Sequence, residues 1–157
     1  MKRNTLLLGL IVLTLLLTGC EPSGLPVIRV TGKVTFEGDS VEGANILFVP
    51  VESDGRSASG LTDANGEFLL MTQGATQNGV LPGSYRVVVS KYMDVDEQGN
   101  PVVFGSSSFD PSARSEPQKQ PISKPLLPLK YESVVTSGLN AEVTKGGANV
   151  FTFELTK

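Results

Sequence analysis

Residues 60–70, with the sequence GLTDANGEFLL, place two oxygen-bearing side chains and a glycine between two apolar segments. This stretch fits either a calcium loop or a tight turn between strands. An EF-hand loop needs oxygen ligands at positions 1, 3 and 5, glycine at 6 and glutamate at 12. With Gly66 at position 6, Asp63 and Asn65 occupy positions 3 and 5, but Leu61 and Thr72 occupy positions 1 and 12. The stretch therefore predicts a structural hairpin turn made by Asp63, Asn65 and Gly66, with no metal.

Strict alternation of apolar and polar side chains surrounds this turn. From Val27 onward one face carries Ile28, Val30, Val34 and Phe36, which indicates a strand with one buried face. Gly32 interrupts the pattern, as a bulge or a close backbone approach would. Seven such segments are predicted as strands: residues 28–36, 45–50, 58–62, 67–71, 84–91, 139–144 and 151–156. No segment has a convincing helical period, so the expected fold is all-β, an antiparallel seven-stranded β-sandwich.

The N-terminus has the pattern of a secretory signal. Two basic residues precede an uncharged apolar run over residues 6–18, which is shorter than the roughly 20 residues that span a membrane. Leu17, Thr18, Gly19 and Cys20 follow, and this tetrapeptide resembles the bacterial lipobox. We therefore expect residues 1–19 to be a signal peptide, with lipidation at Cys20 and a tether over residues 20–26. The alternative is a signal anchor with an incidental cysteine.

Composition excludes several classes of function. The chain of 157 residues has no histidine, and Cys20 is its single cysteine. Catalytic triads, zinc sites and cysteine nucleophiles are therefore excluded, and no cofactor is expected. Removal of residues 1–19 leaves 11 basic and 16 acidic side chains, a net charge of about −5. That charge argues against nucleic acid as a partner.

The alternation fails between residues 92 and 125. This segment is rich in proline and polar residues, and it has too few apolar side chains to offset the entropy of ordering it. We expect a flexible Pro-rich insert within a domain that spans residues 27–157. Leu126, Leu127 and Leu129, which follow the insert, are expected to pack against the edge of the sandwich.

Several motifs carry a family resemblance. They are TGKVTFEGDSVEGANILFVP at residues 31–50, GLTDANGEFLL at 60–70 and LPGSYRVVVSKY at 81–92. In this order and spacing they resemble the carboxypeptidase regulatory-like domain, a transthyretin-like (prealbumin-like) β-sandwich. The stretch PLKYESVVTSGLNAEVTKGGANVFTFEL at residues 128–155 resembles the ends of small lipoproteins that carry this domain and are abundant in planctomycete-like bacteria. The resemblance covers residues 27–91 and 126–157.

The resemblance implies an accessory, non-catalytic domain. The hydrolases of the transthyretin-like group rely on histidines, which this chain lacks. We therefore expect a lipid-anchored interaction module at the cell envelope, facing the periplasm or the exterior, held to the membrane through the lipid on Cys20. Its partner is expected to be an envelope protein. The alternatives are a purely structural surface-coat lipoprotein and a glycan-binding module, although with Tyr85 expected inside, Tyr92 and Tyr131 are the tyrosines left for a glycan platform.

Overall fold

A computed structural model of the chain describes residues 24–102 and 120–157, and it confirms the prediction of an all-β fold. The signal peptide, the lipobox and Cys20 lie outside these residues. The described part contains eleven strands and one 3-10 helix: β1 (Thr31–Phe36), β2 (Asp39–Ser40), β3 (Asn45–Pro50), β4 (Ala58–Leu61), β5 (Glu67–Leu69), β6 (Met71–Thr72), β7 (Gly83–Ser90), β8 (Tyr92–Val95), β9 (Ile122–Pro125), η2 (Leu129–Glu132), β10 (Leu139–Val143) and β11 (Val150–Leu155). Each of the seven segments predicted as strands contains a strand, and the short strands β2, β6, β8 and β9 were not predicted separately.

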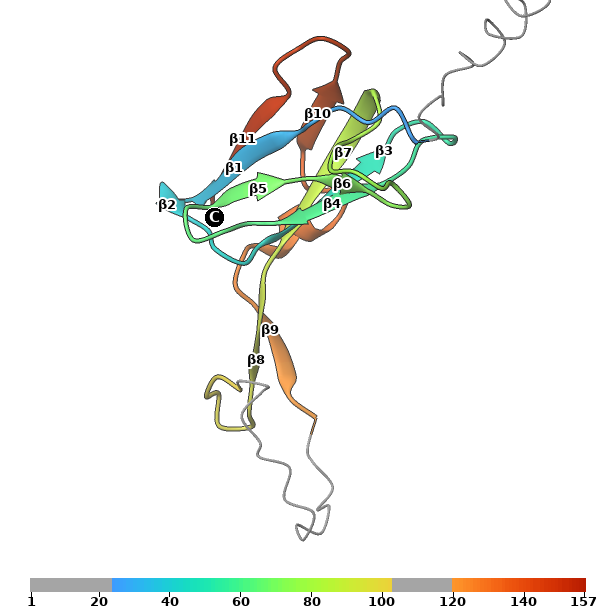
Figure 1. Cartoon of the computed structure of the whole chain (residues 1–157). Helices are drawn as coiled ribbons and strands as arrows, with labels where there is room; N and C mark the ends of the chain where they lie inside the picture. The colour runs from blue at the N-terminus through green and yellow to red at the C-terminus, as the bar shows by residue number, and fades with distance from the viewer. Residues whose placement is uncertain (1–23, 103–119) are drawn as a thin grey trace, which may run out of the picture.

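The strands form two main sheets and a separate two-stranded ribbon (Figure 1). One sheet has the order β10-β7-β3-β4-β6, and all of its pairs are antiparallel. In the other sheet β1 pairs with β11 along one edge and with β2 and β5 along the opposite edge. The β1–β11 pair is parallel, so the prediction of an antiparallel sandwich is wrong for this pair.

The two main sheets face each other across an aromatic core. Phe48 of β3 is fully buried, and its ring centroid lies 5.8 Å from that of Phe151 and 6.2 Å from that of Phe153, both on β11. The Phe68 ring of β5 stacks on Phe153 at 6.1 Å. Tyr85 of β7, which is in the same sheet as Phe48, joins the cluster with its ring 5.7 Å from that of Phe48. These contacts bury large rings from both sheets in one cluster, which gives the described part a sandwich-like core.

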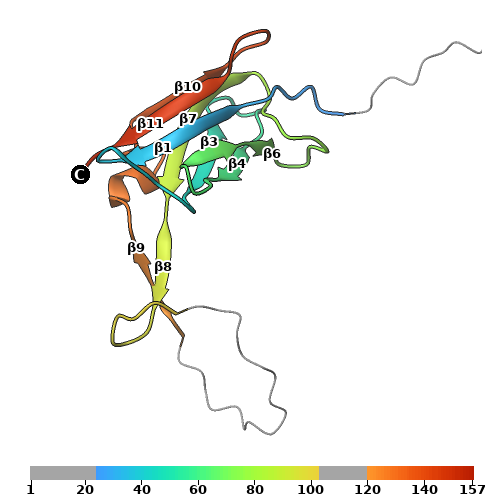
Figure 2. The same ribbon diagram turned by 60° about the vertical axis from the view of Figure 1, so that its left-hand side comes forward.

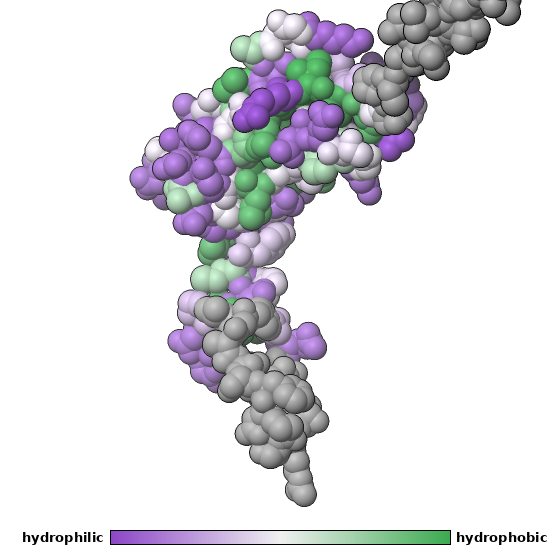
Figure 3. Space-filling view, viewed as in Figure 1, coloured by the Kyte–Doolittle hydropathy of each residue, from purple (hydrophilic) through white to green (hydrophobic). Residues whose placement is uncertain are grey.

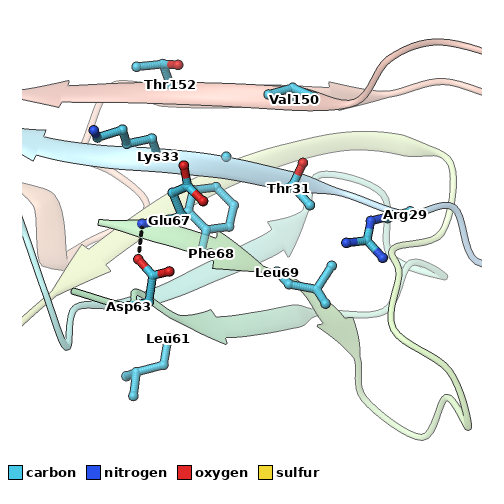
Figure 4. Close-up of a pocket in the computed structure, with 11 residues that line it drawn as sticks. Arg29, Thr31, Lys33, Leu61, Asp63, Glu67, Phe68, Leu69, Val150 and Thr152 are labelled. Carbon is cyan, nitrogen blue, oxygen red and sulfur yellow. Dashed lines mark hydrogen bonds between the residues drawn. The ribbon is translucent and has the colours of Figure 1, made fainter. Parts of the chain in front are cut away.

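Strand β1 follows the predicted alternation. Val30, which precedes it, and Val34 within it are fully buried, whereas Thr31 and Lys33 face outward (Figure 4). Gly32 pairs with Phe151 in an uninterrupted register, so the position is a close approach and not a bulge. A Cβ atom at Gly32 would lie 2.1 Å from the carbonyl oxygen of Phe151. Only glycine leaves room for the backbone of β11 at this point.

The turn at residues 63–66 carries the chain from one sheet to the other. The sequence predicted a β-hairpin, but β4 pairs with β3 and β6, whereas β5 pairs with β1. The hairpin prediction is therefore wrong in its strand pairing. Gly60 explains how β4 and β5 can still lie close together, because a Cβ atom there would lie 2.5 Å from the Leu69 carbonyl oxygen.

The ends of the expected flexible insert form an arm. Strands β8 and β9 pair with each other in antiparallel register and with no strand of the two main sheets. Figures 1 and 2 show this ribbon extending away from the sheets, on the continuation of β7. The prediction of an insert without regular structure is therefore wrong for residues 92–95 and 122–125. We call residues 91–102 and 121–126 the arm.

The leucines after the arm divide between interior and surface. Leu127 is 5 % exposed and belongs to the core, as predicted. Leu126 and Leu129 are 39 % and 64 % exposed, so the prediction that they pack on the sandwich is wrong. Leu127 thus packs in the core where the chain returns from the arm, and η2 then places Tyr131 in the same core.

Candidate functional site

A shallow groove of about 540 Å³ lies on the outer face of the sheet that contains β1 (Figure 4). Alternation along β1 turns Thr31 and Lys33 outward into the groove, with Arg29 just before the strand. Strand β5 lies on one side of β1 in antiparallel register, and β11 lies on the other side in parallel register. Thr31 is therefore flanked by Leu69 and Val150. Lys33 is flanked by Glu67 and Thr152. We call this the sheet groove.

The sheet groove mixes charged and apolar side chains. Arg29 and Lys33 share it with Asp63 and Glu67, and within the described residues none of these four groups has an opposite charge within 4.0 Å. Leu61 and Val150 line it as well and are 64 % and 65 % exposed. Figure 3 shows such apolar side chains gathered between polar ones on this side of the molecule. The groove offers polar and apolar contacts for an extended chain.

The predicted turn residues lie at one end of the sheet groove. The Asp63 carboxylate accepts hydrogen bonds at one oxygen, Oδ1, from the backbone N–H groups of Asn65 (2.9 Å) and Glu67 (2.8 Å). The Gly66 N–H donates to the Asp63 carbonyl oxygen at 2.9 Å, and Gly66 has φ +75°. Asp63 thus caps the turn with its side chain, and Gly66 supplies the left-handed conformation. Within residues 24–102 and 120–157, no group of three or more acidic, histidine or cysteine side chains is arranged to hold a metal ion.

The three tyrosines differ in what they offer a ligand. Tyr85 is buried, as expected, and donates to the Leu81 carbonyl oxygen at 2.8 Å; burial raises the pKa of its phenol. Tyr131 is 6 % exposed and its hydroxyl exchanges hydrogen bonds with the backbone of Thr156. The expectation that Tyr131 is available to a ligand is therefore wrong. Tyr92, at 51 % exposure, is the one tyrosine of the described residues with an open ring.

The arm is held by polar contacts at its base and along its length. The Tyr92 hydroxyl donates to Oε2 of Glu132 in η2, and this bond raises the pKa of the Tyr92 phenol. Further out, the Ser123 hydroxyl donates to the Asp94 carboxylate across the two strands. At the tip, Asp96 accepts bonds from the backbone N–H groups of Gln98 and Asn100 and from the Asn100 side chain. These bonds, the Asn100 side chain first, lower the pKa of Asp96.

The lipobox residues Leu17, Thr18 and Gly19 and the lipidation residue Cys20 lie outside the described residues. No helix in the described part is long and apolar enough to cross a membrane. Comparison of the chain with known protein families, with curated proteins and with solved structures gives no match. Function is therefore inferred from the geometry of this chain.

The arm is the feature that sequence analysis missed. YMDV at residues 92–95 alternates over too few residues to stand out, and ISKP at 122–125 does not alternate cleanly between apolar and polar side chains. A usable signal was present in the prolines. Pro121 and Pro125 are spaced by four residues around a β-branched isoleucine, and that spacing suits one edge of a short strand.

Proposed function

We propose that this chain is a lipid-anchored, non-catalytic interaction module of the cell envelope, with a protein as its partner. In this proposal the lipid on Cys20 holds the chain at the membrane, and the two main sheets form a transthyretin-like sandwich of the carboxypeptidase regulatory-like type. The arm is the element that reaches the partner. Support comes from the motifs of the sequence and from the position of the arm relative to the tether.

The observation that carries the proposal is that Gly24, where the described chain begins, and the arm lie at opposite ends of β7. The chain joins the fold where Ile28 and Val80 exchange two backbone hydrogen bonds of 2.8 Å, close to the start of β7. Gly24 also lies beside Thr76 of the same loop. Strands β7 and β8 then span residues 83–95, which at about 3.3 Å per residue is roughly 40 Å. Figures 1 and 2 agree that the arm points away from the N-terminal end.

This arrangement has a mechanical consequence for an anchored protein. A tether over residues 20–26 is short, so the loop around Thr76 would sit close to the lipid surface. The arm would then stand about 40 Å further out. Strand β7 pairs with β3 on one edge and with β10 on the other. This double pairing makes β7 a stiff spacer between the loop around Thr76 and the arm.

The tyrosines support a protein partner over a glycan. Glycan-binding surfaces present several open aromatic rings, and with Tyr131 buried only Tyr92 offers one among the described tyrosines. The arm instead combines exposed Ile122 and Leu126 with charged side chains, which is a composition suited to a protein surface.

Fluorescence energy transfer tests the orientation. The lipidated chain has no other free thiol, so Thr76→Cys and Ser123→Cys each accept a single donor dye. Both positions are exposed. In vesicles with a headgroup-linked acceptor, we expect high transfer from position 76 and low transfer from position 123. Equal transfer from both positions would refute the proposed geometry, and failure of Cys20 to incorporate labelled fatty acid would refute the anchor.

A further inference from the structure

The register of the arm gives it two chemically different faces. Cross-strand partners lie on the same side of a ribbon, and side chains alternate along each strand. Tyr92 is paired with Pro125 and Asp94 with Ser123, which defines an acidic face. The opposite face, which we call the lysine face, carries the paired side chains Met93 and Lys124, then Val95 and Ile122, and is extended at its base by Lys91 and Leu126.

The lysine face is apolar and basic. Val95 on this face is already buried at 6 % exposure, and the apolar side chains left exposed are Ile122 at 56 % and Leu126 at 39 %. Within the described part of the chain, neither Lys91 nor Lys124 has a carboxylate within 4.0 Å. The carboxylate of Asp94 lies on the other face, where Ser123 holds it. The chain from residue 20 onward carries a net charge of about −5, whereas the described residues of this face carry two lysines and no carboxylate beside them. This local positive charge would orient an acidic partner.

The outer edge of β9 is poorly suited to strand addition. The Leu126 N–H donates to the Lys91 carbonyl oxygen at 2.8 Å, so in the alternation of an antiparallel ladder Ser123 and Pro125 direct their backbone groups outward. Proline has no N–H group, and Pro121 is in step with Pro125. Ser123 is then the one outward N–H donor of β9. Strand addition at the β9 edge is therefore disfavoured, which favours a side-chain face of the arm as the contact with a partner.

A two-stranded ribbon alone is marginally stable in water, and it needs a further layer on an apolar face. We propose that the lysine face of the arm docks on another envelope protein, on a patch where Asp or Glu side chains flank aliphatic ones. This inference rests on the proposed function, because the anchor decides which surfaces the arm can reach. Lys91 and Lys124 would pair with the carboxylates, while Ile122 and Leu126 would be covered by the aliphatic side chains.

The anchor geometry argues against two other occupants. Two copies on one membrane would hold their arms parallel, and face-to-face packing needs the arms about 10 Å apart. Such packing would also set Lys91 and Lys124 of one copy against the same lysines of the other, and like charges repel. Inverting one copy would turn its tether away from the membrane. The anchoring lipid surface lies about 40 Å from the end of the arm, at the other end of β7 and β8.

Photocrosslinking in the native cells tests the docking surface, with the full chain carrying a benzoylphenylalanine at position 122 or at position 123. These neighbours are both exposed but lie on opposite faces. We expect position 122 to give an adduct with one other protein, joined at a peptide that combines Asp or Glu with aliphatic residues. Position 123 should give at least about five-fold less. Lys91→Gln and Lys124→Gln should each lower the yield at position 122 about two- to five-fold.

Lys145→Gln is the matched control, since Lys145 is exposed in the β10–β11 turn and away from the arm, and it should leave the yield unchanged. Four outcomes would overturn the inference. They are equal adduct yields at positions 122 and 123, no adduct at position 122, a yield that neither lysine variant changes, and an adduct with lipid or with a second copy of the chain. The anchor is tested separately in the same cells by fatty-acid labelling and Cys20→Ser. The chain could fail to incorporate the fatty acid and still give an adduct at position 122 that depends on Lys91 and Lys124. That result would support the docking and refute the proposed anchor.

Discussion

Gly66→Ala tests whether the sheet-crossing turn is held against β1 by a contact that only glycine permits. Gly66 has φ +75°, and its carbonyl oxygen accepts a 2.9 Å hydrogen bond from the N–H of Val34. A Cβ atom there would lie 2.6 Å from the Val34 carbonyl oxygen and 3.2 Å from the Val41 nitrogen. These are backbone atoms of buried residues, so the turn and not β1 must move.

Gly138→Ala separates the two contributions. Gly138 has φ +67°, but a Cβ atom there meets nothing within 4 Å. A left-handed alanine costs about 1–2 kcal/mol, and the loss of chain entropy in the unfolded state offsets about 0.4–1 kcal/mol of this. We therefore expect Gly138→Ala to lower the free energy of unfolding by about 1 kcal/mol. Gly66→Ala should lose in addition the bond to Val34, worth about 1–3 kcal/mol when a buried N–H is left unpaired, for a total of about 2–4 kcal/mol.

Urea unfolding measures both values, on the chain from residue 20 with Cys20→Ser to remove the lipid. Circular dichroism is a suitable signal because the chain has no tryptophan. With a slope of about 2 kcal/mol per molar urea, the midpoint of Gly66→Ala should fall about 1 M or more below that of the parent, and about 0.5–1.5 M below that of Gly138→Ala. Equal midpoints for the two variants would show that the close contact between the turn and β1 contributes nothing to stability.

Three further outcomes are expected. Gly32→Ala should destabilise the fold more than either turn variant, as judged by urea unfolding, because its Cβ would lie 2.1 Å from the Phe151 carbonyl oxygen; a loss below about 1 kcal/mol would contradict the close approach. Millimolar calcium should leave the melting temperature unchanged, since Asp63 Oδ1 already accepts two backbone hydrogen bonds, and a rise of several degrees would mean that the turn binds the ion. In an NMR titration the pKa of Asp96 should lie below that of an ordinary aspartate. The contribution of Asp96 to loop stability is therefore present above the pKa of the unfolded state and is lost as the pH falls through the lower pKa of the folded state. An Asp96 that titrates like a free side chain would contradict the capping bonds.

The sequence predicted the strand faces well because alternation reports burial directly. Val34, Val87 and Val89 are fully buried, and Phe153 and Leu155 are nearly so, as their period of two indicates. That period says which face of a strand is covered, but it does not say which strand lies beside it. The parallel pairing of β1 with β11 joins residues more than one hundred positions apart, and no local pattern encodes it.

The turn at residues 63–66 shows the same limit at short range. Asp63 and Gly66 have the conformations of a tight turn, and a hairpin is the commonest structure around such a turn. Strand β5 nevertheless pairs with β1 of the other sheet, and the missing side chain of Gly60 only lets the Leu69 carbonyl pass close to β4. A glycine in a strand signals some close approach, but the sequence does not name the approaching group.

The burial of Tyr131 and the pairing of β8 with β9 depend on partners that are distant in the chain, so the local sequence does not specify them. Tyr131 is buried by docking of η2 on the end of β11, where its hydroxyl meets the backbone of Thr156. The arm forms because residues 92–95 find residues 122–125 at the same register that brings Asp94 to Ser123. Local composition there favours disorder, and the pairing overrides it.

The sheet groove and the arm differ in how their charged side chains are distributed, and this difference bears on which of the two surfaces meets a partner. The groove is lined by Arg29 and Lys33 together with Asp63 and Glu67, so its opposite charges balance one another and would give an approaching charged partner little orientation. The arm separates its charges by face, with Lys91 and Lys124 on one side and Asp94 on the other. Separated charges discriminate between partner orientations, whereas mixed charges do not. If a partner is recognised at both surfaces, Lys124→Gln should therefore lower its association rate at low salt, and Lys33→Gln should change that rate by less than about two-fold. A rate that depends on Lys33 and not on Lys124 would move the docking surface from the arm to the groove.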